Sequence, residues 1–467
     1  MIKKLICTVA LISFYVPILS GCYDYKEPND IAYIVAIGVD EGTHKGVYNF
    51  SLQFARPSQI SGGSSEEGGS GKETIGMVTV EAPSIYSALN MANHVVSKTF
   101  TLSHTKIIVL SDKIAKKGII SLADSLGRSS DIRPYVFMCV SNGDAKKYLK
   151  SVNPVVEINP VKYYRLMFEN PNSSFFPKTT SNEVYENLKS GLCDSVMPLV
   201  GVANKSQNNS ENQAQEGSSQ GGSGGGSGGG SSQGDSGSSG EQAQSSVEES
   251  WQKDKKFLEE EKKIPVNKDG FQYDMKKYIA GELDIQKQND SELVGGAVFH
   301  NDKMIAHMSN IECEIYNMIS GQYQNGYSVI YSPKTPDTPS TIRLEATKKP
   351  TISVDTKTDS PKIKVKLFLE GNFVSVAHNY PIEVKDSEFE QTTSQYIKEA
   401  CEKFLNKSRD EYNSDIFAFA KKAKQNFLNY DDFNSYNWKE KYKNCTFEVE
   451  VNFNIRKTGL TIRERNK

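Results

Sequence analysis

The stretch IAYIVAIGVDEG, residues 31–42, decides which kind of fold we expect. It is an almost continuous apolar run that ends in an acidic turn, which is typical of a buried strand. In the following segment, GVYNFSLQFARP (46–57), apolar and polar residues alternate, as expected of a strand that pairs with the first one. TIGMVTVEAP (74–83) indicates a third strand. Between these two, SGGSSEEGGSGK (61–72) has the composition of a hairpin loop. Three successive strands therefore begin the first folded region.

Helical patterns alternate with further strands after this point. Segment 84–100 carries apolar residues at helical spacing, and Ser84 can cap its first turn. Segment 112–134 indicates one or two helices, broken near Gly118 and Gly127. We also expect strands at 104–111 and 135–143, and a short helix that begins at 144 and ends near 152.

The C-terminal part shows the most regular strand patterns. KIKVKLFLE (362–370) and FEVEVNFNI (447–455) alternate strictly, which marks a sheet that is covered on one side only. The helical region from 387 to about 428 would supply that cover. Before it, segment 291–321 predicts two short strands around the turn His300-Asn301-Asp302, followed by a helix. The class that these patterns predict is α+β, multi-domain, with mixed or antiparallel sheets covered by helices.

The N-terminus has the layout of a secretory signal. Two lysines precede an apolar run of roughly 15 residues, which is shorter than the ~20 residues that span a bilayer. The run ends in Leu19-Ser20-Gly21-Cys22, which looks like a lipobox. In proteins with that motif the thiol receives diacylglycerol, the peptide is cut before the cysteine, and acyl chains such as palmitate hold the protein on the membrane. We therefore expect a signal peptide at 1–21 and a lipid on Cys22; the alternative is a plain signal peptide with an incidental cysteine.

A Gly/Ser-rich stretch divides the remainder of the chain. Its composition cannot bury enough apolar surface to offset conformational entropy, so we expect a disordered linker. The expected boundaries are a lipoprotein signal peptide at 1–21, an N-terminal α/β domain at 22–204, the linker at 205–255, a middle domain at 256–345 and a C-terminal α+β domain at 346–467.

Charge and cysteine usage narrow the class of partner. The formal net charge is -2 and the basic residues are not clustered, which argues against nucleic acid as a partner. Beyond Cys7 and Cys22 the cysteines are far apart and lack C-x-x-C spacing, so we expect neither a disulfide framework nor a zinc site. We expect these residues to be small members of the core. They are Cys139, Cys193, Cys313, Cys401 and Cys445.

No catalytic constellation stands out, although several residues allow two interpretations. His104 opens a strand and suggests a structural role, whereas His300 and His307 lie seven residues apart across a turn, where a metal pair is the alternative. Asp40 is either an acid at a strand end or a turn former, and Asp415 caps or breaks the long helix. We expect no catalytic residue, no metal site and no cofactor.

Aromatic side chains gather in NYDDFNSYNWKEKY, residues 429–442. Such a cluster forms either a surface for a partner or a core at the end of a helix.

Several blocks, in order and nearly from end to end, resemble one known family, the Ger(x)C spore-germination lipoproteins. The first is Cys22 followed by an aromatic residue and an acid, and then DIAYIVAIGVDEG, where the family has a Cys-Trp-Asp start and an apolar strand ending Gly-x-Asp. The others are EAPSIYSAL (81–89), LSHTKIIVLSDKIAKKGI with SLADSLGRSSDIRP (102–134), GGAVFHNDKMIAHMSNIE (295–312), SDIFAFAKKAKQ (414–425), Trp438 and FEVEVNFNIRKTGL (447–460).

The sequence departs from the family pattern at a few positions. Tyr23 replaces the usual Trp, Ala420 stands where many members have Gly, and His307 and Met308 replace small or apolar residues. The long Gly/Ser insertion is also atypical. These departures leave the anchor motif and the domain pattern in place.

The resemblance implies a non-enzymatic C subunit of a nutrient germinant receptor. Such a protein has three α/β-type domains and lies on the outer face of the spore's inner membrane. It acts with two polytopic membrane subunits, an A-type and a transporter-like B-type subunit. Two other interpretations stay open. One is a solute-binding lipoprotein of a transporter, which predicts two similar lobes around a cleft. The other is an anchored hydrolase, which predicts clustered His, Asp or Ser in a cleft.

Overall fold

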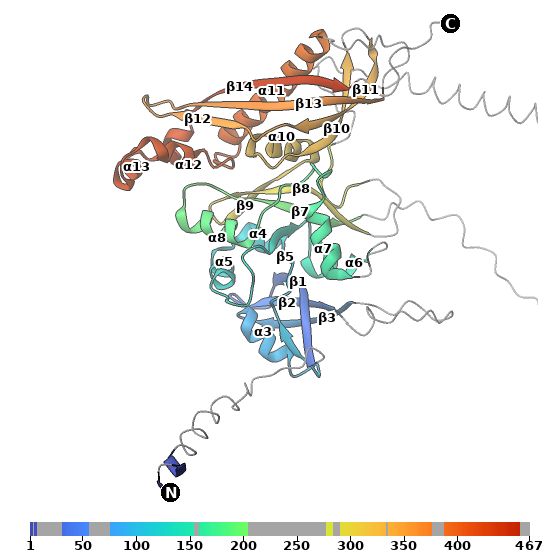
Figure 1. Cartoon of the computed structure of the whole chain (residues 1–467), viewed down its shortest axis with the longest axis vertical. Coiled ribbons are helices and arrows are strands. Elements are labelled where there is room, and N and C mark those ends of the chain that lie inside the picture. The colour runs from blue at the N-terminus through green and yellow to red at the C-terminus, as the bar shows by residue number, and fades with distance from the viewer. Residues whose placement is uncertain are drawn as a thin grey trace, which may run out of the picture. The chain divides into compact units, whose positions relative to one another are not determined.

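Two β-sheets organise the part of the chain that the structure describes (Figure 1). This computed structural model describes residues 1–2, 4–6, 30–55, 75–153, 157, 159–203, 277–283, 290–332, 335–375 and 387–457. One sheet is mixed, the other is mainly antiparallel, and helices cover both. The predicted α+β class is therefore confirmed.

The first sheet has nine strands and is built around the apolar stretch that begins at residue 31. Its strands are β1 (Ile31–Glu41), β2 (Tyr48–Ala55), β3 (Ile75–Ala82), β4 (Thr99–Thr101), β5 (Ile107–Ser111), β6 (Phe137–Ser141), β7 (Val196–Val202), β8 (Ser291–His300) and β9 (Lys303–Met308). They follow the order β3-β2-β1-β5-β6-β7-β8-β9, and β4 pairs with the start of β1. The pairs from β1 to β7 are parallel and the outer pairs are antiparallel. Residues 34–39 of β1 are all buried, as its apolar run predicts.

Helices pack on both faces of this sheet. They are α3 (Ile85–Ala92), α4 (Asp112–Lys117), α5 (Ile120–Gly127), α6 (Ala145–Ser151), α7 (Pro160–Glu169) and α8 (Ser181–Ser190). Apolar side chains of α3, α4, α5 and α8 join one core cluster, whereas α6 and α7 contribute to a second cluster. Figure 1 shows α5 and α8 on the opposite side of the strands from α6 and α7.

The chain leaves the first sheet at β7 and returns to it at β8. These strands are antiparallel neighbours, with Val202 opposite Ser291. The two strands expected in a middle domain at 256–345 are β8 and β9, and both complete the first sheet. The two strands that follow them, which the sequence patterns did not predict, belong to the second sheet. The domain boundaries stay a prediction, and the expected linker at 205–255 and loop at 61–72 lie outside the described residues.

The second sheet has five strands, and one long helix covers it. The strands are β10 (Asn325–Ser332), β11 (Thr335–Ala346), β12 (Thr351–Asp355), β13 (Lys362–Ser375) and β14 (Thr446–Lys457). The helices of this part are α10 (Asn310–Ser320), α11 (Ser387–Asp410), α12 (Phe419–Ala423), α13 (Tyr430–Tyr436) and α14 (Trp438–Tyr442). The alternating apolar residues of β13 are buried, and α11 packs against β14. On the other face, Lys364 and Lys366 pair with Glu448 and Glu450 across the parallel β13–β14 ladder.

Two helix predictions were too long. The predicted helix 84–100 ends at Ala92, because Thr99 opposes Ile31 and the β4–β1 ladder takes over the backbone hydrogen bonds there. The predicted helix from 387 to 428 ends at Asp410. Asn413 and Ala418 then adopt positive φ angles of 49° and 58°, which a right-handed helix does not accommodate.

No helix among the described residues combines the length and the apolar character that crossing a bilayer requires.

Candidate functional site: a buried polar joint between the two sheets

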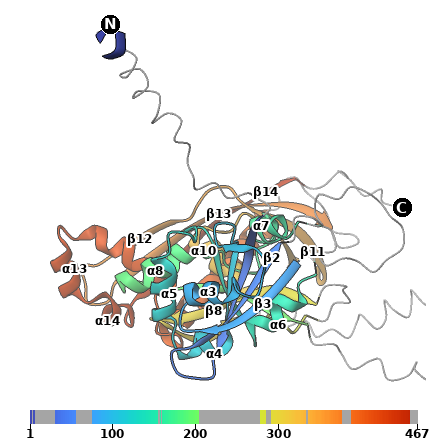
Figure 2. The same cartoon turned by 90° about the horizontal axis from the view of Figure 1, so that it is seen from below.

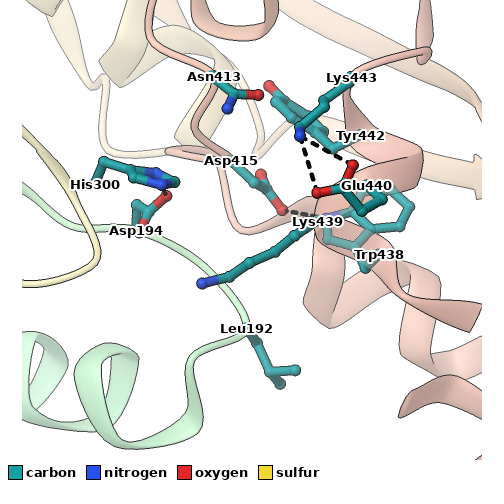
Figure 3. Close-up of a pocket in the computed structure, with 10 residues that line it drawn as sticks. All are labelled: Leu192, Asp194, His300, Asn413, Asp415, Trp438, Lys439, Glu440, Tyr442 and Lys443. Carbon is teal, nitrogen blue, oxygen red and sulfur yellow. Dashed lines mark hydrogen bonds and ion pairs between the residues drawn. The ribbon is translucent and has the colours of Figure 1, made fainter. Parts of the chain in front are cut away.

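A small cavity of about 130 Å³ lies where the end of α8, the β8–β9 turn and the segments around α12 and α14 meet (Figure 3). Figure 2 shows the helices α13 and α14 on the same side as α8. The cavity is lined by Leu192, Asp194, His300, Asn413, Asp415, Trp438, Lys439, Glu440, Tyr442 and Lys443. We use the name polar joint for the connected side chains at this place: Asp194, His300, Asn301, Ser414, Asp415 and Trp438.

Two tight backbone turns bring the first-sheet residues into the joint. Gly191 ends α8 in the left-handed conformation, with φ 62°, so that the chain turns directly into β7 and places Asp194 between them. The hairpin between β8 and β9 pairs His300 with Lys303, and Asn301 in the turn has φ 53°. Asparagine tolerates this conformation better than most residues, which suits it to a two-residue hairpin turn.

Asp194 connects the two sheets through its carboxylate. This buried carboxylate accepts a hydrogen bond from the backbone N–H of Asn301 at 2.6 Å and from the hydroxyl of Ser414 at 2.8 Å. His300 Nδ1 lies 3.2 Å from the same carboxylate. The backbone N–H of Asp194 also donates to the carbonyl of Asp415 at 3.2 Å. One residue of the connection between α8 and β7 is thus bound to two consecutive residues of the C-terminal part.

Asp415 organises the C-terminal side of the joint. Its carboxylate accepts from the backbone N–H groups of Phe419 and Ala420, at 3.0 Å and 2.7 Å, and so caps the start of α12. It also accepts from the indole Nε1–H of Trp438 at 2.9 Å, as Figure 3 shows. Burial raises the pKa of Asp415 to about 6, and the nearby Asp194 acts in the same direction, against the three hydrogen bonds.

The joint holds Ser, Asp and His together, but in an order that does not activate a nucleophile. In a serine hydrolase the imidazole lies between the hydroxyl and the carboxylate, so that it can remove the hydroxyl proton. Here the carboxylate of Asp194 lies between Ser414 and His300, and the Ser414 hydroxyl is also only 3.1 Å from the carbonyl of Phe299. The geometry therefore supports a connection between sheets and gives no support to an anchored hydrolase.

The histidines have separate partners. His300 contacts Asp194, whereas His307 Nε2 lies 3.5 Å from Asp112 Oδ1. His104 packs edge-on against Tyr33, with 4.6 Å between ring centroids, in agreement with a structural role. Over the described ranges, no three or more His, Cys, Asp or Glu side chains are grouped as metal ligands would be.

The other candidates from the sequence are placed as follows. The Asp40 carboxylate accepts from the N–H groups of Ala145 and Lys146, so it caps α6 and is not a turn former. In segment 429–442 the side chains of Phe433, Trp438 and Tyr442 are buried, which confirms a core cluster. The lipid attachment predicted at Cys22 lies outside the described residues. The five later cysteines are buried and free, as expected for core residues.

Sequence reasoning identified Asp415 but missed its partners. Asp194 lies between a helix and a strand that the sequence patterns did not predict. Ser414 stands next to Asp415, yet nothing in the local sequence indicates that its hydroxyl meets a residue 220 positions away.

Comparison with known proteins identifies the family. The model described as "Spore germination protein N-terminal domain" matches residues 24–202, and "Spore germination B3/ GerAC like, C-terminal" matches residues 294–459. The chain is 27% identical over 201 residues to spore germination protein KC of Bacillus subtilis (strain 168). That match covers 42% of this chain and 49% of the relative, so the chain spans about half the length of this curated protein.

A solved structure of the GerBC protein aligns with a TM-score of 0.47 at 11% sequence identity, over 90% of this chain and 96% of that one. The two family models together match both the region before the Gly/Ser stretch and the region after it, including all residues of the polar joint. The chain therefore belongs to the Ger(x)C family of spore germination proteins.

Proposed function

We propose that this protein is the membrane-anchored, non-catalytic lipoprotein subunit of a nutrient germinant receptor, and that spore germination requires it. The observation that carries the proposal is the combination of family membership with a lipobox cysteine. Cys22 lies only nine positions before Ile31, where β1 begins. A lipid on Cys22 would therefore hold the first sheet close to the outer face of the spore's inner membrane.

The proposed partners are two polytopic membrane subunits, an A-type and a transporter-like B-type subunit. The polar joint connects the first-sheet region to the C-terminal part of the same chain, through the hydrogen bond from Ser414 to Asp194 and the backbone hydrogen bond from Asp194 to Asp415, which supports a structural role for it. The order of its Ser, Asp and His side chains supports a non-catalytic role.

The alternative of a solute-binding lipoprotein predicts two similar lobes. The two sheets differ in strand number and order, and helices cover both faces of the first sheet. No observation therefore favours this alternative.

Substitution of the lipobox cysteine tests the anchor directly. In Cys22→Ala spores we expect the protein to leave the membrane fraction, to lose labelling by an alkyne fatty acid, and to support nutrient-triggered germination poorly. The matched control is Cys7→Ala, which removes a thiol from the same segment and leaves the tetrapeptide unchanged.

Normal germination by a Cys22→Ala protein that is fully released from membranes would contradict the requirement for anchoring. Membership of a complex is tested separately by co-purification of the wild-type chain from spore membranes. Recovery of the chain without any polytopic subunit would contradict the receptor role.

A further inference from the structure

A second and larger cavity lies away from the polar joint, at the C-terminal end of α10. Its volume is about 470 Å³, which is in the range of cavities that bind small organic molecules. Its wall comes from the end of α10 and the turn after it, from the end of β11 and the loop before β12, and from the middle of β13. A single residue of the first-sheet region, Lys178, completes it. We call it the lysine cavity.

Three lysines line this cavity: Lys178, Lys348 and Lys349. Within the described ranges their ammonium groups form no ion pair with a carboxylate. Lys178 is half-buried, and burial lowers its pKa, while the charge of Glu169 acts against this shift. A half-buried ammonium that forms no ion pair with a described carboxylate has lost part of its hydration, and an anion beside it would restore the lost interaction.

The backbone holds Lys178 in place at the cavity. Its N–H donates to the side-chain oxygen of Gln322 at 2.7 Å, and Gln322 itself lines the cavity. This hydrogen bond connects the loop before α8 to the turn after α10. The fold thus fixes the backbone of Lys178 at the edge of the cavity.

The remaining lining is largely apolar. Met318, Pro350 and Phe368 contribute to it, and the ammonium of Lys348 lies 3.7 Å from the centroid of the Phe368 ring. Such a cation–π contact holds the charge next to an apolar surface. A molecule that fills the cavity would therefore meet both a cationic group and an apolar wall.

The C-terminal end of α10 lies beside the cavity and disfavours a highly charged anion there. The C-terminus of α10 presents carbonyl groups with partial negative charge. The carbonyl of Asn317 already accepts from the N–H groups of Gly321, Gln322 and Tyr323, so it is occupied by backbone donors. Among the described residues that line the cavity there is no arginine, the side chain best suited to phosphate. These features favour a singly charged carboxylate over a phosphate.

We propose that the lysine cavity binds a small organic anion, namely a carboxylate with an apolar body. This site is independent of the lipid anchor and of the receptor role. A failure of either proposal therefore leaves the other untouched.

Equilibrium dialysis of the full chain, purified in dodecyl maltoside, against radiolabelled benzoate tests the proposal. We expect one saturable site per chain. The Lys178→Met variant should weaken binding by about 10-fold or more, because it removes a charge-assisted contact, whereas Lys178→Arg should retain most of it. The control Lys147→Met removes an exposed lysine of α6 that pairs with Asp144 at the start of the same helix, and it should bind like the wild type.

Two competitors test separately whether the ligand needs its negative charge and whether it needs its apolar body. Benzyl alcohol lacks the charge and sulfate lacks the apolar body, so neither should displace benzoate at equal concentration. The absence of saturable binding, or equal affinity in wild type and in a folded Lys178→Met variant, would overturn the site. Displacement by sulfate as effective as by unlabelled benzoate would overturn the assignment to an organic carboxylate.

Discussion

Asp415 shows how a single buried carboxyl group influences the stability of the C-terminal region. It caps α12, receives the Trp438 indole N–H and lies next to the backbone of Asp194. Three donors stabilise its ionised form, yet burial outweighs them and raises its pKa to about 6. In the unfolded chain an aspartate titrates near pH 4, so the folded state binds a proton more tightly than the unfolded state does.

This difference predicts a pH dependence with a defined sign. Since the pKa is higher in the folded state, the stabilising contribution of Asp415 is complete below the unfolded pKa and is lost as the pH rises through about 6. From pH 4.5 to pH 7.5 the carboxyl should lower the free energy of unfolding by about 2 kcal/mol. The asparagine side chain of Asp415→Asn does not titrate, and it leaves one backbone or indole donor without an acceptor. The variant should therefore be less stable than the wild type at both pH values, by about 1–3 kcal/mol at pH 7.5.

Urea unfolding of both proteins at the two pH values measures this effect. The stability gap between wild type and Asp415→Asn should be about 2 kcal/mol larger at pH 4.5 than at pH 7.5. The exposed Asp431→Asn serves as the control and should show no such change. A gap that is the same at both pH values would contradict a raised pKa for Asp415.

The helix α11 covers the second sheet, and the sequence anticipated this role. Its buried residues recur at helical spacing, and Phe404 packs edge-on against Phe417, with 5.8 Å between ring centroids. Phe417 lies in the segment that leads into the polar joint, where it also stacks on Tyr316 of α10. The covering helix therefore also supports the connection between the sheets.

Truncation of Phe404 should be strongly destabilising. Phe404 is 3% exposed, and replacement of a buried phenylalanine by alanine costs about 3–5 kcal/mol through lost burial and the cavity that remains. Its neighbour Lys403 is exposed, so Lys403→Ala should change stability by less than about 0.5 kcal/mol. Urea denaturation monitored by circular dichroism compares the two variants. Similar stabilities for both would show that α11 does not support the sheet as described.

The two sheets are connected over long distances in sequence. The hydrogen bond between Ser414 and Asp194 spans 220 positions, and Lys421 of α12 reaches Asn187 of α8 at 3.2 Å. Strands β7 and β8 are direct neighbours even though the whole Gly/Ser stretch lies between them. The first sheet thus includes strands from both sides of that stretch.

This topology predicts the effect of shortening the expected linker. Deletion of 210–245 reduces the connection between Val202 and Ser291 by less than a factor of two, and the two residues remain adjacent in the sheet. Loop-closure entropy changes by only about 0.6 kcal/mol per doubling of length, so the thermal transition should shift by less than about 2 °C. Scanning calorimetry of the full chain measures this shift. A large destabilisation would show that residues 210–245 contribute folded contacts.

The sequence predicted best those features that depend only on residues close together in the chain, namely burial patterns and helix caps. The apolar run of β1, the strict alternation of β13 and β14 and the Ser84 cap of α3 were confirmed, because burial patterns and caps depend on nearby residues. It failed where distant partners decide the outcome. The pairing of β4 with β1 ended the predicted helix early, and α7, α8 and β7 carry weaker patterns that sequence reasoning left unassigned.

Three features could be predicted without the fold: the α+β class, the family resemblance and the motif on which the proposed anchor at Cys22 depends. Each of these depends on residue types at short spacing, which can be identified without knowing the fold. Three others required the folded chain: that β8 and β9 complete the first sheet, that Asp194 contacts Ser414 and Asp415, and that Lys178 lines the same cavity as two distant lysines. The physical reason is that hydrogen bonds and desolvation depend on which groups the folded chain brings within a few ångströms, and sequence spacing carries no record of that.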